Sequence, residues 1–167
     1  MKWENRPIEV AYLLNPAFCT VLLLDSIRAY EKLDKKGMSY FLVFLVLPLL
    51  LHGKTRKNIP VKHKTTLFEW VKKQQITNYL LAEHIRQKQP YTKEALMFAI
   101  QQDILKFGDE EQNTGNILAT TRNLHDDDIW TKSDTADEFK RKAGVIGGWF
   151  GEVGDVATIY RVLGIYP

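Results

Sequence analysis

Residues 104–120, Ile-Leu-Lys-Phe-Gly-Asp-Glu-Glu-Gln-Asn-Thr-Gly-Asn-Ile-Leu-Ala-Thr, decide which fold the sequence predicts. Two short apolar runs, Ile104–Phe107 and Asn116–Thr120, flank the polar stretch Gly108–Gly115. Strand-like runs that are separated by such a turn-forming stretch indicate a β-hairpin. Most of the remaining sequence has helical patterns, so we expect a mainly α fold with one small β-hairpin.

Helix signals precede the hairpin. Thr66 and Glu69 form a capping-box pattern, in which each side chain can bond a free backbone N–H group at a helix start. That helix would run to about Gln75, and a second helix is expected over about 76–88. Pro90 is expected to stop the chain there, because proline lacks the N–H group that a helix interior needs.

Thr92 is placed to cap a third helix over 92–103. Three helices followed by a hairpin is the order of a winged helix, so residues 65–121 are predicted to form a winged-helix-like core. Lys93 is the only cation of the third helix, and the expected wing carries the acidic run Asp109–Glu111. This charge pattern disfavours reading of DNA bases through that surface and favours protein docking.

The first third of the chain, residues 1–53, is predicted to form apolar packing helices. Asn15-Pro16 is typical of a helix start, and the helix is expected to run from Pro16 to Leu33. The uncharged run Tyr40–Leu51 is predicted to be a buried helix that bends near Pro48. Much of this apolar surface is expected to become buried only when a partner is present.

A membrane location is not expected. A spanning helix needs about 20 apolar residues, whereas the Tyr40–Leu51 run is shorter and is flanked by charges. Residues 1–7 lack the apolar stretch of a signal peptide. Cys19 is the single cysteine, so no internal disulfide is possible, and its apolar neighbours indicate a packing role. A cytoplasmic protein is therefore predicted.

Two further helices are predicted over residues 134–167. The first runs from about Asp134 to Glu152, and the second is a short helix that Gly164 ends. The first helix has one apolar stripe, which consists of Phe139, Ala143, Ile146 and Phe150. Together with the preceding regions, these helices complete a single compact domain over 1–167. This length supports a hydrophobic core without disulfides or bound metal.

The segment Gly53–Thr65 reads as a polar, basic connection. It carries the candidate contacts to nucleic acid or to an acidic partner: Lys54, Arg56, Lys57, Lys62 and Lys64. Such a cluster can neutralise phosphates, but it is also common in a solvated loop. The net charge of +3 is too small to choose between these alternatives.

No catalytic residue, cofactor or metal ligand is predicted. The run His125–Asp128 is interpreted as a solvated acidic loop, because adjacent residues cannot all face one ion. The glycines within Gly144–Gly151 match no phosphate-binding motif and indicate close helix packing around Trp149. The sequence thus predicts a protein that is not an enzyme.

Three aromatic residues and one arginine supply the candidate partner interface: Trp3, Trp149, Phe150 and Arg6. Tryptophan is enriched where proteins make their strongest contacts. The four tryptophans of the sequence are Trp3, Trp70, Trp130 and Trp149. Core packing is the alternative role for each of them, and we expect it for at least two of the four.

Three stretches resemble the middle components of bacterial three-component ABC systems, a group that includes the small third subunit of Lamassu-type antiphage systems. They are Trp3–Cys19, then Tyr91–Phe98 with the earlier Leu45–His52 segment, and finally Gly144–Pro167 with its Gly-Trp-Phe, Thr-Ile-Tyr and Leu-Gly-Ile-Tyr-Pro runs. Together these stretches reach from one end of the chain to the other.

The resemblance implies an accessory subunit without catalytic residues. Its partners would be an SMC- or Rad50-like ABC ATPase and a variable effector, often a nuclease, which the middle component bridges or regulates. DNA would be contacted through the complex. The alternative function is a winged-helix DNA-binding regulator.

Overall fold

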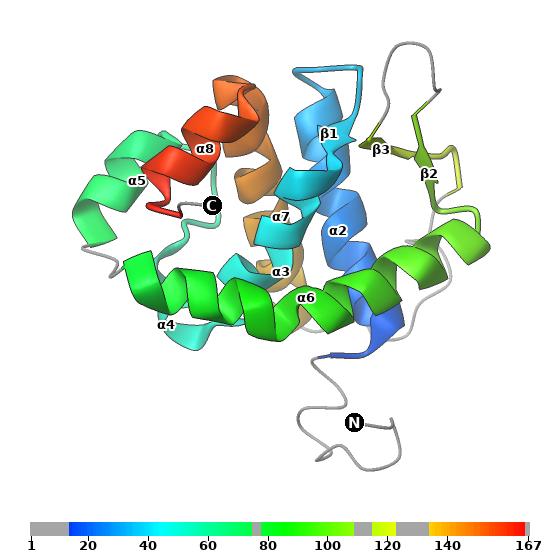
Figure 1. Cartoon of the computed structure of the whole chain (residues 1–167), viewed down its shortest axis with the longest axis horizontal. Helices are drawn as coiled ribbons and strands as arrows, with labels where there is room; N and C mark the ends of the chain where they lie inside the picture. Colours follow the sequence, from blue (N-terminus) through cyan, green and yellow to red (C-terminus); the bar gives the residue numbers. More distant parts are fainter. Residues whose placement is uncertain (1–13, 75–77, 109–114, 123–133, 166–167) are drawn as a thin grey trace.

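The structure, a computed structural model, describes residues 14–74, 78–108, 115–122 and 134–165. Helices dominate these residues, and a small three-stranded antiparallel sheet lies at one side (Figure 1). The mainly α class with a small β element is therefore confirmed.

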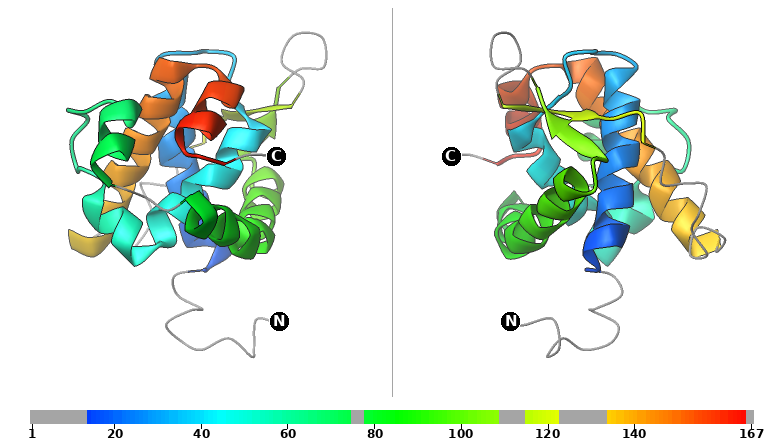
Figure 2. Two further views of the ribbon diagram at one scale, coloured as in Figure 1. Left: turned by 60° about the vertical axis from the view of Figure 1, so that its left-hand side comes forward. Right: turned by 90° about the vertical axis from the view of Figure 1, so that its right-hand side faces the viewer.

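Helix α2 (Pro16–Glu31) lies at the centre of the molecule. Asn15 caps it as predicted, because its side-chain oxygen accepts a hydrogen bond from the Ala17 N–H group at 2.9 Å. Helices α3 (Tyr40–Leu51), α6 (Asn78–Gln101) and α7 (Asp134–Val153) pack around α2 (Figures 1 and 2).

Helix α3 is buried, as predicted, and Pro48 lies inside it. Every residue from Leu42 to Leu50 is buried, which explains why this stretch has no polar stripe. Cys19 of α2 is also fully buried and packs in the same core. No helix in the described ranges is long and apolar enough to cross a membrane.

The expectation that the N-terminal apolar surface needs a partner for its burial is wrong for the described residues. The chain itself covers this surface: α2 packs against α3, α6 and α7, and its apolar side chains join one core cluster. The sequence pattern alone could not show this, because α7 lies more than a hundred positions further along the chain.

The predicted helix break at Pro90 is wrong. Helix α6 runs without interruption from Asn78 to Gln101, so two helices, not three, precede the hairpin within 65–121. Thr92 does not cap a new helix. Its hydroxyl donates to the Lys88 carbonyl oxygen one turn earlier, at 3.2 Å, and its side chain is buried. Packing of α6 on α2 and α3 offsets the hydrogen bond that proline removes.

The segment Gly53–Thr65 is not wholly a connection, because its first half forms helix α4 (Gly53–Asn58). The unrecognised cap is His52, whose Nδ1 accepts from the Thr55 backbone N–H group at 3.3 Å. Helix α5 (Leu67–Gln74) starts as predicted. Its capping box is complete: Thr66 N–H donates to Glu69 Oε2, and Glu69 N–H donates to Thr66 Oγ1.

Strands β2 (Leu105–Phe107) and β3 (Asn116–Ala119) form the predicted hairpin, with Lys106 opposite Leu118. A third strand was not predicted: β1 (Met38–Ser39) pairs antiparallel with β3, which gives the sheet order β1-β3-β2. A strand of two residues is too short to show an alternating pattern.

Helices α7 and α8 (Val156–Val162) confirm the two predicted C-terminal helices. The stripe predicted on α7 is buried in full. Gly147 and Gly151 allow α7 to approach the backbone of α2 and the turn that follows it, so close packing explains these glycines as expected. Gly164, at φ 67°, follows α8 in the left-handed conformation that favours glycine.

Candidate functional site

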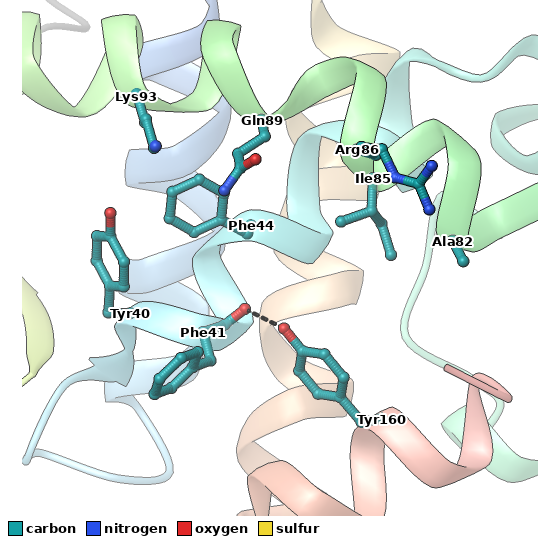
Figure 3. A pocket seen from close by; sticks show the side chains of 9 residues that line it. All are labelled: Tyr40, Phe41, Phe44, Ala82, Ile85, Arg86, Gln89, Lys93 and Tyr160. Carbon is teal, nitrogen blue, oxygen red and sulfur yellow. Dashed lines mark hydrogen bonds between the residues drawn. The ribbon is translucent and has the colours of Figure 1, made fainter. Parts of the chain in front are cut away.

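An open groove of about 470 Å³ lies between α3, α6 and α8 (Figure 3). This volume is within the range of about 300–1,000 Å³ typical of ligand sites. We call it the α3–α6 groove. Its lining residues are Tyr40, Phe41, Phe44, Ala82, Ile85, Arg86, Gln89, Lys93 and Tyr160.

The first turn of α3 supplies the aromatic wall. The ring centroids of Tyr40 and Phe44 are 4.8 Å apart in an edge-to-face arrangement. Phe41 is 64% exposed, which is unusual for so large an apolar side chain. The sheet fixes the start of the helix, because the Tyr40 backbone N–H group donates to the Gly115 carbonyl oxygen at 2.7 Å.

Helix α6 supplies the opposite wall. Ala82, Ile85, Arg86, Gln89 and Lys93 are spaced by three or four residues and therefore lie on one face. Lys93 joins this face because α6 continues through the predicted break at Pro90. Figure 3 shows these side chains along one side of the helix, opposite the aromatic wall.

Tyr160 of α8 closes one end of the groove. Its hydroxyl donates a hydrogen bond to the Phe41 carbonyl oxygen at 2.9 Å (Figure 3). Burial raises the pKa of Tyr160 above its ordinary value, so the phenol is neutral and remains a donor at physiological pH. The bond links α8 to the aromatic wall of α3 at this end of the groove.

The charge of the groove is positive. Its lining includes Arg86 and Lys93 but no carboxylate. Arg86 Nη1 also lies 3.3 Å from Glu83 Oε2, one turn earlier on α6. This ion pair is exposed, so solvent weakens it. The combination of exposed aromatic surface and cations is suited to a ligand that has an apolar group next to negatively charged groups.

The predicted basic cluster is largely exposed but is not in this groove. Lys54 and Lys57 lie on α4, and Lys62 and Lys64 follow it in the loop. Arg56 differs from these lysines, because its guanidinium lies 4.4 Å from the centroid of the buried Phe139 ring and it donates to the Leu50 carbonyl oxygen at 3.4 Å. Arg56 therefore has a packing role.

The two predicted partner-interface residues that the structure describes, Trp149 and Phe150, do not lie at the surface. Trp149 and Phe150 are both fully buried in the core. The Trp149 indole N–H group donates to the Thr65 carbonyl oxygen, which satisfies its polar atom inside the protein. Trp70 is buried as well, so core packing of two tryptophans is confirmed. Trp3, Arg6 and Trp130 lie outside the described residues.

Histidines do not create a metal centre within the part of the chain that the structure describes, where no group of three or more potential ligands occurs. His52 and His84 stack with ring centroids 4.0 Å apart. Burial, followed by repulsion from His84 and Lys54, lowers the pKa of His52. The His125–Asp128 run lies outside the described ranges.

The sequence did not reveal the groove. Its nine lining residues come from three segments, and neither the exposure of Phe41 nor the continuity of α6 is visible in a local pattern. The available signal was the i, i+3, i+4 spacing of residues 82–93, from which the expected break at Pro90 separated Lys93.

Comparison with protein families gives a match over nearly the whole chain. Residues 3–167 match the family model described as "ABC-three component (ABC-3C) system Middle Component 3". No curated protein and no solved structure matches the chain significantly. Because the family model covers nearly the whole sequence, the chain belongs to the middle component 3 family of ABC-three component systems.

Proposed function

We propose that this protein is a non-catalytic accessory subunit that bridges or regulates an SMC- or Rad50-like ABC ATPase and an effector, often a nuclease, in a cytoplasmic bacterial antiphage complex of the Lamassu type. The observation that carries the proposal is the match of residues 3–167 to a middle-component family. The open groove supports it, since a bridging subunit needs a surface for a partner.

We also propose that six elements make up a winged helix: α2, β1, α3, α6, β2 and β3. Helices α4 and α5 are then inserted between its second and third helices. The element order and the sheet order β1-β3-β2 support this reading. These boundaries differ from the predicted 65–121, because the first two helices then come from the N-terminal third.

DNA binding is the second candidate function. Lys54, Lys57, Lys62 and Lys64 favour it, because all four are exposed and can neutralise phosphates. Their position counts against joint use with the wing: α4 and the β2–β3 hairpin lie toward opposite ends of the long axis of the molecule (Figure 1). We therefore rank the subunit role first.

The subunit role is tested by co-expression of the tagged chain with the ATPase and effector of its own gene cluster. Near-stoichiometric co-purification, retained after nuclease treatment, is the expected result. Wild-type chain that elutes without either protein would refute the proposed function.

DNA binding is tested with the isolated chain on duplex DNA at several salt concentrations. The charge-reversal variant K54E/K57E would weaken binding and reduce its salt dependence if these lysines hold phosphate. The matched control is K35E/K36E, which reverses two exposed lysines after α2. Equal effects of the two variants would remove the specific case for α4.

A further inference from the structure

We propose that the α3–α6 groove docks a short segment of a partner protein in which a large apolar side chain is flanked by carboxylates. This inference rests on the proposed function, since it identifies where this subunit receives a partner. Three observations carry it: the exposed aromatic wall, the cationic rim and the preformed end of the groove.

The aromatic wall selects for an apolar side chain. Phe41 is 64% exposed beside the half-buried Tyr40, and Ile85 of α6 also lines the groove (Figure 3). Insertion of an aromatic or aliphatic side chain would remove this apolar surface from water. Anchors of this kind, seated in a pocket, supply most of the affinity of many protein interfaces.

The rim selects for negative charge next to that anchor. Arg86 and Lys93 lie two turns apart on α6, and Gln89 lies between them. Carboxylates that flank the anchor would pair with these cations, and the incoming charge would compete with the exposed Glu83–Arg86 pair. A basic segment would meet like charge and be rejected.

The groove is preorganised. The Tyr160 hydroxyl bond to the Phe41 carbonyl oxygen sets the separation of α3 and α8, and α6 is held against α3 by packing. A groove that is formed before binding costs less conformational entropy when it is occupied.

Other occupants fit less well. Two cations around an aromatic wall provide few phosphate contacts, so nucleic acid would bind weakly. A second copy of the chain joined through the same patch would bring two copies of the cationic groove together, since a two-fold interface joins identical surfaces.

The test uses the full chain and a yeast-displayed library of random short peptides. Peptides that bind the wild type are expected to combine a large apolar residue with Asp or Glu. F41E and R86E/K93E are each expected to weaken binding by about tenfold or more. The matched controls keep wild-type affinity: F68E changes an exposed phenylalanine on α5, and K72E/K73E reverses two exposed lysines there.

Enrichment of basic or purely polar peptides, or binding that F41E leaves unchanged in a variant with wild-type thermal stability, would overturn the proposal. The same variants are then compared in the co-purification assay. If the wild type assembles and F41E assembles equally well, the groove assignment is wrong while the subunit role stands. If the wild type does not assemble, the subunit role fails, and the peptide library still decides the chemistry of the groove.

Discussion

Gly147 of α7 packs directly on the backbone of Ser26 in α2: a Cβ atom added to Gly147 would lie 1.9 Å from the Ser26 carbonyl oxygen. The next nearest atoms, at 2.7 and 2.9 Å, also belong to the Ser26 backbone. A side chain could therefore be accommodated only by separation of the two helices. This contact joins the central helix to a helix that begins about a hundred residues later.

The substitution Gly147→Ala is expected to lower the free energy of unfolding by about 3 kcal/mol, because overpacking must move backbone instead of a flexible side chain. Gly144→Ala is the matched control. Nothing lies within 4 Å of its added Cβ, so better helix propensity should stabilise the protein by about 0.5–1 kcal/mol. Urea unfolding measures both values, and equal effects would show that α7 does not approach α2 so closely.

Pro90 lies at an exposed position inside α6. Pro90→Ala restores a helical N–H donor and removes a clash, so we expect a gain of about 2 kcal/mol, reduced somewhat by the greater freedom of the unfolded chain. The control is Gln89→Ala at the adjacent exposed position, which should change stability little. If Pro90→Ala leaves the stability unchanged or lowers it, the helix is naturally broken at Pro90.

Lys142 is only 4% exposed, and its ammonium donates to the Arg56 carbonyl oxygen at 2.7 Å and to Glu138 Oε1 at 2.6 Å. Glu138→Ala would leave this buried charge with one fewer partner. Because Glu138 is about half exposed, we expect a loss of only about 1 kcal/mol. Glu83→Ala, which removes an exposed pair on α6, should cost at most about 0.5 kcal/mol in the same unfolding assay. A larger loss for Glu83→Ala would contradict this ranking.

The lowered pKa of His52 makes stability depend on pH. As the pH falls below about 6.5, the unfolded chain binds a proton at this residue before the folded protein does. Stability should therefore decrease as the pH falls from about 7.5 through the folded pKa of His52, and be regained as the pH rises. His52→Asn keeps a side-chain acceptor at the start of α4 but does not titrate, so the slope in this window should become smaller. Thermal unfolding at several pH values measures it, and identical slopes would exclude His52 as the cause.

Local sequence signals predicted much of the fold because they act between neighbouring residues. Asn15 at the start of α2 and the Thr66–Glu69 pair at the start of α5 form the expected caps. The hairpin strands and both C-terminal helices also formed as predicted. The helix through Pro90 could not be predicted in this way, because packing against α2 and α3 offsets the local cost of proline.

The candidate site was less predictable than the fold. Exposure of an aromatic residue depends on what the rest of the chain covers. Trp149 is buried although tryptophan is a common anchor residue at interfaces, whereas Phe41 is exposed within an otherwise buried helix. The basic residues were recognisable as a group, but only their placement shows that Arg56 packs on Phe139 while Lys54 and Lys57 remain exposed.

The packing of α2 on α7 also has a consequence for biosynthesis. A ribosome that adds about 5–20 residues per second needs several seconds to pass from the end of α2 to the start of α7. Throughout that interval the apolar face of α2 lacks its main cover, and the nascent chain exposes it to the crowded surroundings of the ribosome. Chaperone binding during translation would therefore affect the yield of this protein more strongly than the stability of its finished fold would suggest.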